Sequence, residues 1–282
     1  MSSIERRPAD RPGSSSVDRR PGMPEIFRAR RRQLTLVLLV LVMAVAASSV
    51  ITQFSYRQAA LSVPKAFGWL ARNVIPDVAS LGKLPQILSK LAQTIVVSVM
   101  ATVFATLCAF VFAILGSQAT RPHPALSTVV RAVGSVFRNI PVVAWAMVLL
   151  LSFGQSLLTG LLALFFATFG FLVRSFLETI DETSRSSVEA LQAAGATWGQ
   201  TVVQAVVPST LPQVLSWMLY MVETNIRDAT LVGILTGTGI GFTFDLYYNA
   251  LNYRAAGLVV VSIVAVVLII ENISNLIRRV IL

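Results

Sequence analysis

Six continuous apolar runs constrain this chain more than any other feature. They lie at about residues 34–52, 91–115, 139–153 with its approach from Val133, 157–173, 211–235 and 256–277. Runs of this length cross the hydrocarbon core of a bilayer as α-helices, whereas the strands of a membrane barrel alternate apolar and polar residues. Apolar residues make up 55% of the chain and charged residues 13%. The sequence therefore predicts an all-α membrane protein with six transmembrane helices.

Basic residues predict how these helices are oriented, because Lys and Arg accumulate on the cytoplasmic side of a membrane. Arg278 and Arg279 follow the last run, and a larger group precedes the first: Arg6, Arg7, Arg11, Arg19, Arg20, Arg28, Arg30, Arg31 and Arg32. Six crossings between these groups place both termini in the cytoplasm. Four cations fall in the first external loop and oppose this assignment, although they weigh less than the larger group: Arg57, Lys65, Arg72 and Lys83.

The sequence divides into three parts. Residues 1–33 form a basic leader that is expected to be cytoplasmic and disordered, residues 34–85 hold the first helix and an external loop, and residues 86–282 hold the other spans. The charge of the leader favours anionic lipid over nucleic acid, because no aromatic residue interrupts it before Phe27. A cleaved signal peptide is the alternative for this region. A lone Cys and a lone His exclude an intrachain disulfide and a metal cluster.

A polar segment at residues 186–212 lies between the fourth and fifth runs, on the predicted cytoplasmic side. Ser186 and Glu189 have the spacing of a capping box, which predicts that a short helix starts at Ser186. Gly195 readily adopts the left-handed conformation that ends such a helix. A second helix is expected to follow, and its predicted start and stop signals are Thr197, Gln200 and Pro208. Two helices should therefore meet at Gly195.

This segment resembles the EAA loop of bacterial ABC import permeases. The resemblance is carried by Glu189-Ala190-Leu191, then Gly195, then Ala205-Val206-Val207-Pro208, with apolar exchanges at Leu191, Ala205 and Val207. It implies a type I ABC importer permease fold, in which this loop forms cytoplasmic coupling helices that sit in a groove of an ATP-binding subunit. The coupling residues that it implies are Glu189, Ala190, Ala194, Gly195 and Pro208. Without the resemblance, Glu189 and Gly195 are the caps of an ordinary loop.

Polar side chains interrupt the fifth apolar run at Glu223, Asn225, Arg227 and Asp228. A charge at the bilayer centre costs about 2.5–3.5 kcal/mol on insertion scales, so these groups must face protein, water or one another. Glu223 and Arg227 are one helical turn apart, which predicts an ion pair, either structural or part of a pathway. Beyond them stand Gly237, Gly239 and Gly241. They favour a helix break or close packing, since no strand precedes them as a dinucleotide site requires.

The same stretch resembles a signature of the phosphonate-type branch of these permeases. Its matching residues are Glu223, Asn225, Arg227, Ala229, Thr230 and Gly233, with Arg138-Asn139-Ile140-Pro141 and Leu161-Leu162-Ala163-Leu164 upstream. The chain departs from the pattern at Thr236-Gly237-Thr238. It also departs at Phe166-Ala167-Thr168, and it is in this second segment that relatives often carry a histidine. Taken together, the resemblances cover residues 86–282. Arginine suits phosphorus oxygens through its planar fork. The expected lining of an anion pathway is Arg138, Asn139, Glu223, Asn225 and Arg227.

These features predict the permease subunit of an ATP-driven importer for phosphonate or a related phosphorus oxyanion, in a bacterial cell membrane. The resemblance implies as partners two ATP-binding subunits, a second permease copy in a homodimer, and an extracytoplasmic solute-binding protein. No G-x-x-x-x-G-K-[ST] sequence is present, so ATP hydrolysis is expected in another subunit, and this chain needs no cofactor. No catalytic set of side chains can be assembled either. The alternatives are a permease for methionine or another small solute, and an ion-coupled secondary transporter in which Glu223 carries a proton.

Overall fold

The computed structural model describes residues 23–281, so the disorder predicted for residues 1–22 lies outside the described residues. The chain forms two compact units, Met1–Ala66 and Phe67–Leu282. In the first, helix α1 (Met23–Ile51) begins ahead of the leader boundary predicted at residue 33. Pro24 stands in its first turn, where a proline costs no hydrogen bond. The Glu, Ala and Arg residues that follow are good helix formers.

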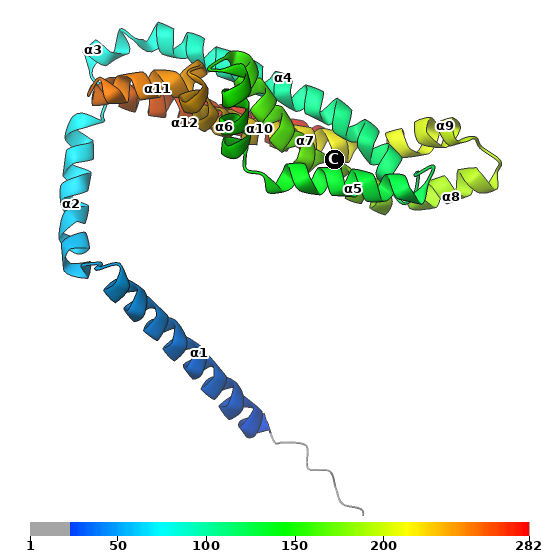
Figure 1. Cartoon of the computed structure of the whole chain (residues 1–282), viewed down its shortest axis with the longest axis horizontal. Helices are drawn as coiled ribbons and strands as arrows, with labels where there is room; N and C mark the ends of the chain where they lie inside the picture. The colour runs from blue at the N-terminus through cyan, green and yellow to red at the C-terminus, as the bar shows by residue number, and fades with distance from the viewer. Residues whose placement is uncertain (1–22, 282) are drawn as a thin grey trace, which may run out of the picture. The chain divides into compact units, whose positions relative to one another are not determined.

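Every secondary-structure element of the described residues is helical, as predicted. Helix α2 (Tyr56–Asn73) runs across the boundary between the two units in the sequence. The helices that follow are α3 (Val78–Leu81), α4 (Leu84–Gly116), α5 (Pro124–Asn139), α6 (Val142–Phe153), α7 (Leu157–Thr183), α8 (Arg185–Ala193), α9 (Trp198–Thr201), α10 (Val207–Thr236), α11 (Gly239–Asn249) and α12 (Tyr253–Ile281). Figure 1 shows that α8 and α9 project beyond one end of the long helices.

Helices α4 and α7 run in the same direction, so the chain must cross back between them. At one end, a Cβ on Gly116 of α4 would lie 3.2 Å from the side chain of Leu177 of α7. At the other end, Thr94 of α4 and Leu157 of α7 line the same small cavity. The chain must therefore return through α5 and α6 between the end of α4 and the start of α7. Five long apolar helices and this bent pair, counted as one, give six candidate spans.

The third span is not the straight helix that the apolar run at residues 139–153 predicts. Helices α5 and α6 meet at 90°. Pro141 has no N–H to donate and disfavours the helical conformation of the residue before it. Ile140 is accordingly extended, with φ −93° and ψ 118°. Helix α6 has 12 residues, or about 18 Å, which is too short to cross a bilayer alone.

Pro208 does not stop a helix, contrary to the prediction. Helix α9 continues into α10 through a π-helical turn at Val202–Val206, and the whole stretch counts as one candidate span. The N–H of Val207 donates to the Val202 carbonyl, five residues back. This wider turn lies just ahead of the proline ring, which clashes with the carbonyl four residues before it in an α-helix. The helix therefore passes the proline without a break.

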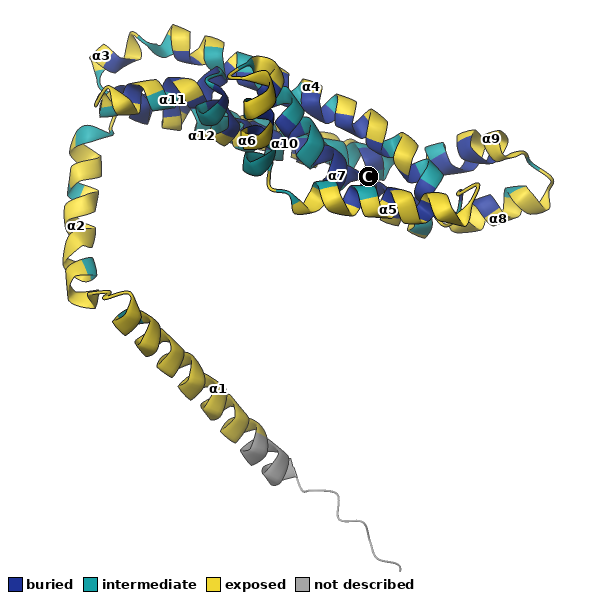
Figure 2. Cartoon of the chain, viewed as in Figure 1, coloured by how far each residue is buried: buried dark blue, intermediate teal, exposed yellow. Residues whose placement is uncertain are grey.

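Small side chains allow the spans to pack closely. Every fourth residue on one face of α4 has no exposed surface: Ala101, Ala105, Ala109 and Ala113. Three of these alanines share a buried cluster with Leu172, Val173 and Phe176 of α7. Lipid supplies no hydrophobic driving force between helices, so close contact of this kind holds them together. Figure 2 shows the resulting alternation of buried and exposed positions along α4.

The glycine run after α10 breaks the helix and permits close packing, as the sequence predicts. Gly237 is left-handed at φ +66° and ends α10, and Gly239 begins α11. A Cβ on Gly241 would lie 1.9 Å from the Thr230 carbonyl oxygen. Helix α11 therefore folds back against α10 at a distance that only glycine permits. The apolar runs do not predict α11, because it is too short to span a membrane.

Candidate coupling loop and transport pathway

Helix α8 begins at Arg185, and the capping box predicted for Ser186 does not form. Its N-cap is Ser184, whose hydroxyl donates to the Ile180 carbonyl of α7 at 2.6 Å. Helix α7 thus continues almost directly into α8, and Ser184 serves the end of the first helix. Glu189 has no free helix start to cap, and its carboxylate lies 3.2 Å from the Arg185 Nε, one turn back. Both charges are exposed, so this pair stabilises little.

Gly195 ends α8 in the predicted left-handed conformation, with φ +84°. The N–H of Gly195 donates to the Gln192 carbonyl, and the N–H of Ala196 donates to the Leu191 carbonyl, both at 3.0 Å. These two bonds form a Schellman motif, which satisfies carbonyls that the end of a helix leaves free. A Cβ on Gly195 would meet no atom within 4 Å. The requirement for glycine at this position is therefore conformational and not steric.

Helix α9 starts where the sequence predicts. The N–H of Thr197 donates to Gln200 Oε1 at 2.8 Å, as expected for the second capping box. Trp198 then donates its indole N–H to the carbonyl of Thr120 at 2.7 Å. Since Thr120 lies in the connection between α4 and α5, this bond joins two loops at the same end of the bundle. No pattern in the sequence predicts it.

The hairpin of α8 and α9 is buried on one side and open on the other. Val188, Ala205 and Val206 belong to the core cluster that includes α4 and α7. All five predicted coupling residues are exposed, four of them in the hairpin and Pro208 in the first turn of α10: Glu189, Ala190, Ala194, Gly195 and Pro208. The hairpin is thus anchored to the bundle and has exposed surface that is available to another protein.

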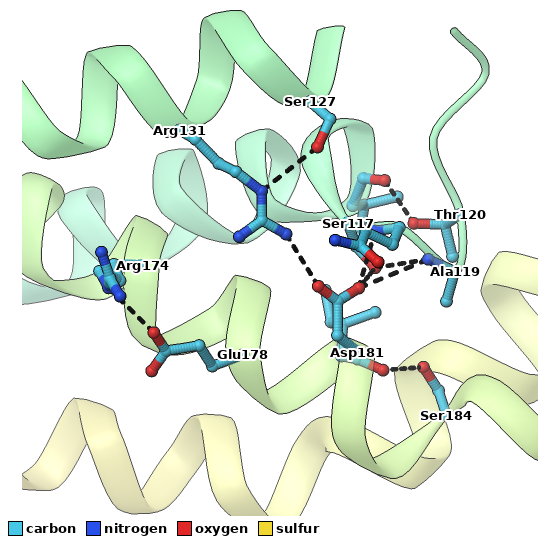
Figure 3. A network of polar contacts seen from close by, with 12 residues as sticks. Ser117, Ala119, Thr120, Ser127, Arg131, Arg174, Glu178, Asp181 and Ser184 are labelled. Carbon is cyan, nitrogen blue, oxygen red and sulfur yellow. Dashed lines mark hydrogen bonds and ion pairs between the residues drawn. The ribbon is translucent and has the colours of Figure 1, made fainter. Parts of the chain in front are cut away.

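Asp181, near the end of α7, joins this helix to the connection between α4 and α5 and to α5 itself. Its Oδ1 accepts the hydroxyl of Ser117 at 2.5 Å and the N–H of Gln118 at 2.7 Å. Its Oδ2 lies 2.9 Å from Arg131 of α5. Figure 3 shows these groups converging on the carboxylate. The sequence analysis missed this network, and the available signal was an acidic residue at the very end of a span.

The ion pair predicted in α10 is present. Arg227 Nη2 lies 2.5 Å from Glu223 Oε1, and the side chains are 51% and 13% exposed. The carboxylate is therefore largely covered by protein, whereas half of the guanidinium side chain remains open on the surface of a span. A cation at membrane depth must meet water or a polar partner.

Asn225 lies on the other face of α10, because two residues on a helix are about 200° apart. It is 1% exposed. Its Nδ2 lies 2.8 Å from the hydroxyl of Thr102 on α4 and 2.8 Å from that of Thr168 on α7. Asn225 therefore joins three spans inside the bundle and is not grouped with the exposed pair.

Arg138 and Asn139, at the end of α5, are exposed. Helix α5 ends against α7 at Gly170, where a Cβ would lie 2.4 Å from the Arg138 nitrogen. Gly170 and Thr168 are about 200° apart on α7, so α7 separates the backbone of Arg138 from Asn225. The structure thus brings Glu223 and Arg227 together but does not join all five predicted pathway residues in one seam of a single chain.

Known proteins resemble this chain over most of its length. The family model described as binding-protein-dependent transport system inner membrane component matches residues 105–281. The phosphate-import permease protein PhnE of Mycolicibacterium smegmatis is 30% identical over 211 residues, which are 75% of this chain and 39% of that protein. The phosphite transport system permease protein PtxC of Stutzerimonas stutzeri is 29% identical over 67% of this chain and 69% of its own length.

Among solved structures, an inward-facing conformation of the MetNI methionine ABC transporter is similar in fold. The match has a TM-score of 0.62 at 20% identity, and it covers 70% of this chain and 96% of the matched chain. At this identity the similarity concerns the fold alone.

Proposed function

The chain belongs to the family of binding-protein-dependent transport system inner membrane components, and we propose that the solute it conducts is a small phosphorus oxyanion. Its fold is that of type I ABC importer permeases. It is a multi-pass permease subunit of an ABC importer and not itself an enzyme. ATP-binding subunits and a solute-binding protein are its partners.

The observation that carries the choice of solute is the similarity to two permeases named for phosphate and phosphite import. Phosphonate, phosphite and phosphate share a phosphorus centre with negatively charged oxygens. The half-exposed side chain of Arg227 supports the same choice, because a guanidinium on the surface of a span attracts such an anion and binds its oxygens through two N–H groups.

The pathway in this proposal lies between two copies of the chain. The ion pair of Glu223 and Arg227 faces this pathway from α10. The side chains of Arg138 and Asn139 face it from the bend between α5 and α6. This arrangement is supported by the exposure of Arg227, Arg138 and Asn139 within one chain. In it, Asn225 fixes the rotation of α10 from behind, through its bonds to α4 and α7.

The exposed hairpin of α8 and α9 docks in this proposal onto an ATP-binding subunit, one hairpin to each of two such subunits. Closure of those subunits moves the hairpin, and the bonds of Asp181 and Trp198 pass this motion to α4, α5 and α7 as a rigid body. The support for this role is the geometry of the hairpin, which is anchored on one side and free on the other.

If the hairpin docks onto an ATP-binding subunit, the hairpin and both termini lie in the cytoplasm. A cysteine at Ser62 should then react with an impermeant thiol reagent added outside cells, and a cysteine at Ser187 should not. Both positions are exposed, so accessibility within the chain is matched. Replacing Cys108 with serine removes the background thiol. Reaction of the cysteine at Ser187 from outside would show that the orientation is the opposite of the one proposed.

Uptake by the purified transporter with its partners in proteoliposomes tests the solute. We expect ATP-dependent uptake of labelled phosphonate, with competition by phosphite or phosphate and none by methionine. Uptake should stop without ATP and persist when an ionophore collapses ion gradients. Uptake of methionine instead would overturn the solute class. Uptake driven by a gradient without ATP would favour a secondary transporter.

A further inference from the structure

Helix α2 carries three of the four basic residues that oppose the predicted orientation, and the bundle does not explain them. At about 100° per residue, one face of α2 is apolar and consists of Tyr56, Ala60, Val63, Phe67 and Leu70. Its cations lie on the polar side of the helix, at Arg57, Lys65 and Arg72. The helix contains no buried residue. Within the apolar face, Val63 is 53% and Phe67 is 68% exposed.

Both ends of α2 are held at a membrane boundary. Before it, the span α1 ends at Ile51, only four residues ahead of α2. Behind it, the chain packs on the start of the span α12. The ring of Trp69 lies edge-to-face on Tyr253, with centroids 5.1 Å apart. A Cβ on Gly257 would lie 1.9 Å from the carbonyl oxygen of Val74. A helix tied to two spans in this way cannot move far from the bilayer surface.

We propose that α2 lies in the membrane surface, with its apolar face among the acyl chains and its cations on anionic phospholipid headgroups. A basic amphipathic helix with aromatic residues buries its apolar face about 5–10 Å into the headgroup boundary. With 18 residues, α2 is about 27 Å long, so its three cations are spread over a row of headgroups. Tyr56 and Trp69 are the aromatic types that gather at this depth.

This placement accounts for three of the four cations of the first external loop. Phosphate groups neutralise Arg57, Lys65 and Arg72 at the outer surface, so these residues do not compete with the arginines of the leader for the cytoplasmic side. The inference is independent of which solute is carried. The side of the membrane follows from the orientation proposed above, because the chain reaches α2 after one crossing from the cytoplasmic amino terminus.

Spin labels on α2 of the complete transporter in lipid nanodiscs test the proposal. Single cysteines at Ala60 and Val63 report on the apolar face, and cysteines at Gln58 and Ser62 are neighbouring controls on the polar side, all in the Cys108→Ser background. Oxygen partitions into lipid, whereas a charged nickel chelate stays in water. We expect Ala60 and Val63 to meet oxygen freely and the nickel chelate about tenfold less than the controls, because their depth excludes the chelate.

Two outcomes of this measurement would overturn the proposal. Low access of both reagents to Ala60 and Val63 would show that a protein, such as the solute-binding protein or a second permease, covers this face. Equal nickel access at all four positions would show that the face lies in water. Both outcomes remain readable when transport is impaired, since the labels report on position and not on activity.

The headgroup contact has its own test. In nanodiscs of anionic lipid, replacing Arg57, Lys65 and Arg72 together with glutamine should raise nickel access to the label at Val63. In zwitterionic lipid the same replacement should have little effect, because the attraction to net negative charge is absent. An equal change in both lipids, or none in either, would overturn the role of anionic headgroups.

Discussion

The substitution Gly195→Val isolates the conformational requirement of the coupling hairpin. A Cβ at this position meets no atom within 4 Å, so the substitution introduces no clash. What changes is the cost of φ +84°, because the left-handed region costs an L-residue about 1–2 kcal/mol. That cost lowers the equilibrium ratio of formed to unformed Schellman turn by a factor of about 5–30. We expect solute-stimulated ATP hydrolysis to fall by up to that factor, since α8 and α9 lose their fixed angle in the fraction of molecules without the turn.

The assay is ATP hydrolysis by the reconstituted transporter, with and without solute and its binding protein. Two further variants serve as controls. Gly199→Val adds the same side chain in open space at a helical position of α9 and should retain stimulation. Gly195→Asn should retain most of it, because asparagine tolerates the left-handed region. Equal stimulation in Gly195→Val and wild type, with all proteins inserted, would refute the reasoning.

Further predictions concern three polar contacts. Hydrogen bonding to Arg254 holds the pKa of Asp77 below its ordinary 3.8, so this contribution to thermal stability should be constant at neutral pH and be lost as pH falls through that lowered value. Asp77→Asn should make the difference between neutral and acid melting curves smaller by the contribution of this group. Asn225→Leu should lower stability by about 1 kcal/mol, since two membrane hydrogen bonds are worth about 0.6 kcal/mol each, and an unchanged melting temperature would count against it. Reversing the pair with Glu223→Arg and Arg227→Glu should restore assembly relative to either single change while oxyanion uptake stays low, and full uptake would leave Arg227 only a structural role.

Continuous apolar runs predict the spans well, because the bilayer demands long stretches without charge. The exceptions are local and concern prolines. Pro141 bends the third span by 90°, whereas Pro208 leaves its helix intact behind a π turn. The sequence around each proline does not predict which of them breaks its helix, because the result depends on how the neighbouring backbone rearranges its hydrogen bonds.

The predictions for helix caps were likewise partly confirmed and partly wrong. Gly195 and Thr197 act as predicted, because left-handed backbone and N-cap bonding depend on a few adjacent residues. Ser186 does not, because its helix follows α7 without a gap. The bonds of Asp181 to Ser117 and Arg131 join positions far apart in the sequence. A single sequence contains the residue types for such a network but not their distances.

The most direct test of the account is to identify what the exposed hairpin contacts in the assembled transporter. A photo-crosslinking residue at Ala194 samples its free surface, and the same residue at Leu151, which is 89% exposed on α6, serves as an exposed control outside the hairpin. The account predicts an adduct between this chain and an ATP-binding subunit from position 194 and none from position 151. Absence of that adduct from 194, in complexes that hydrolyse ATP on solute addition, would contradict the coupling role of the hairpin.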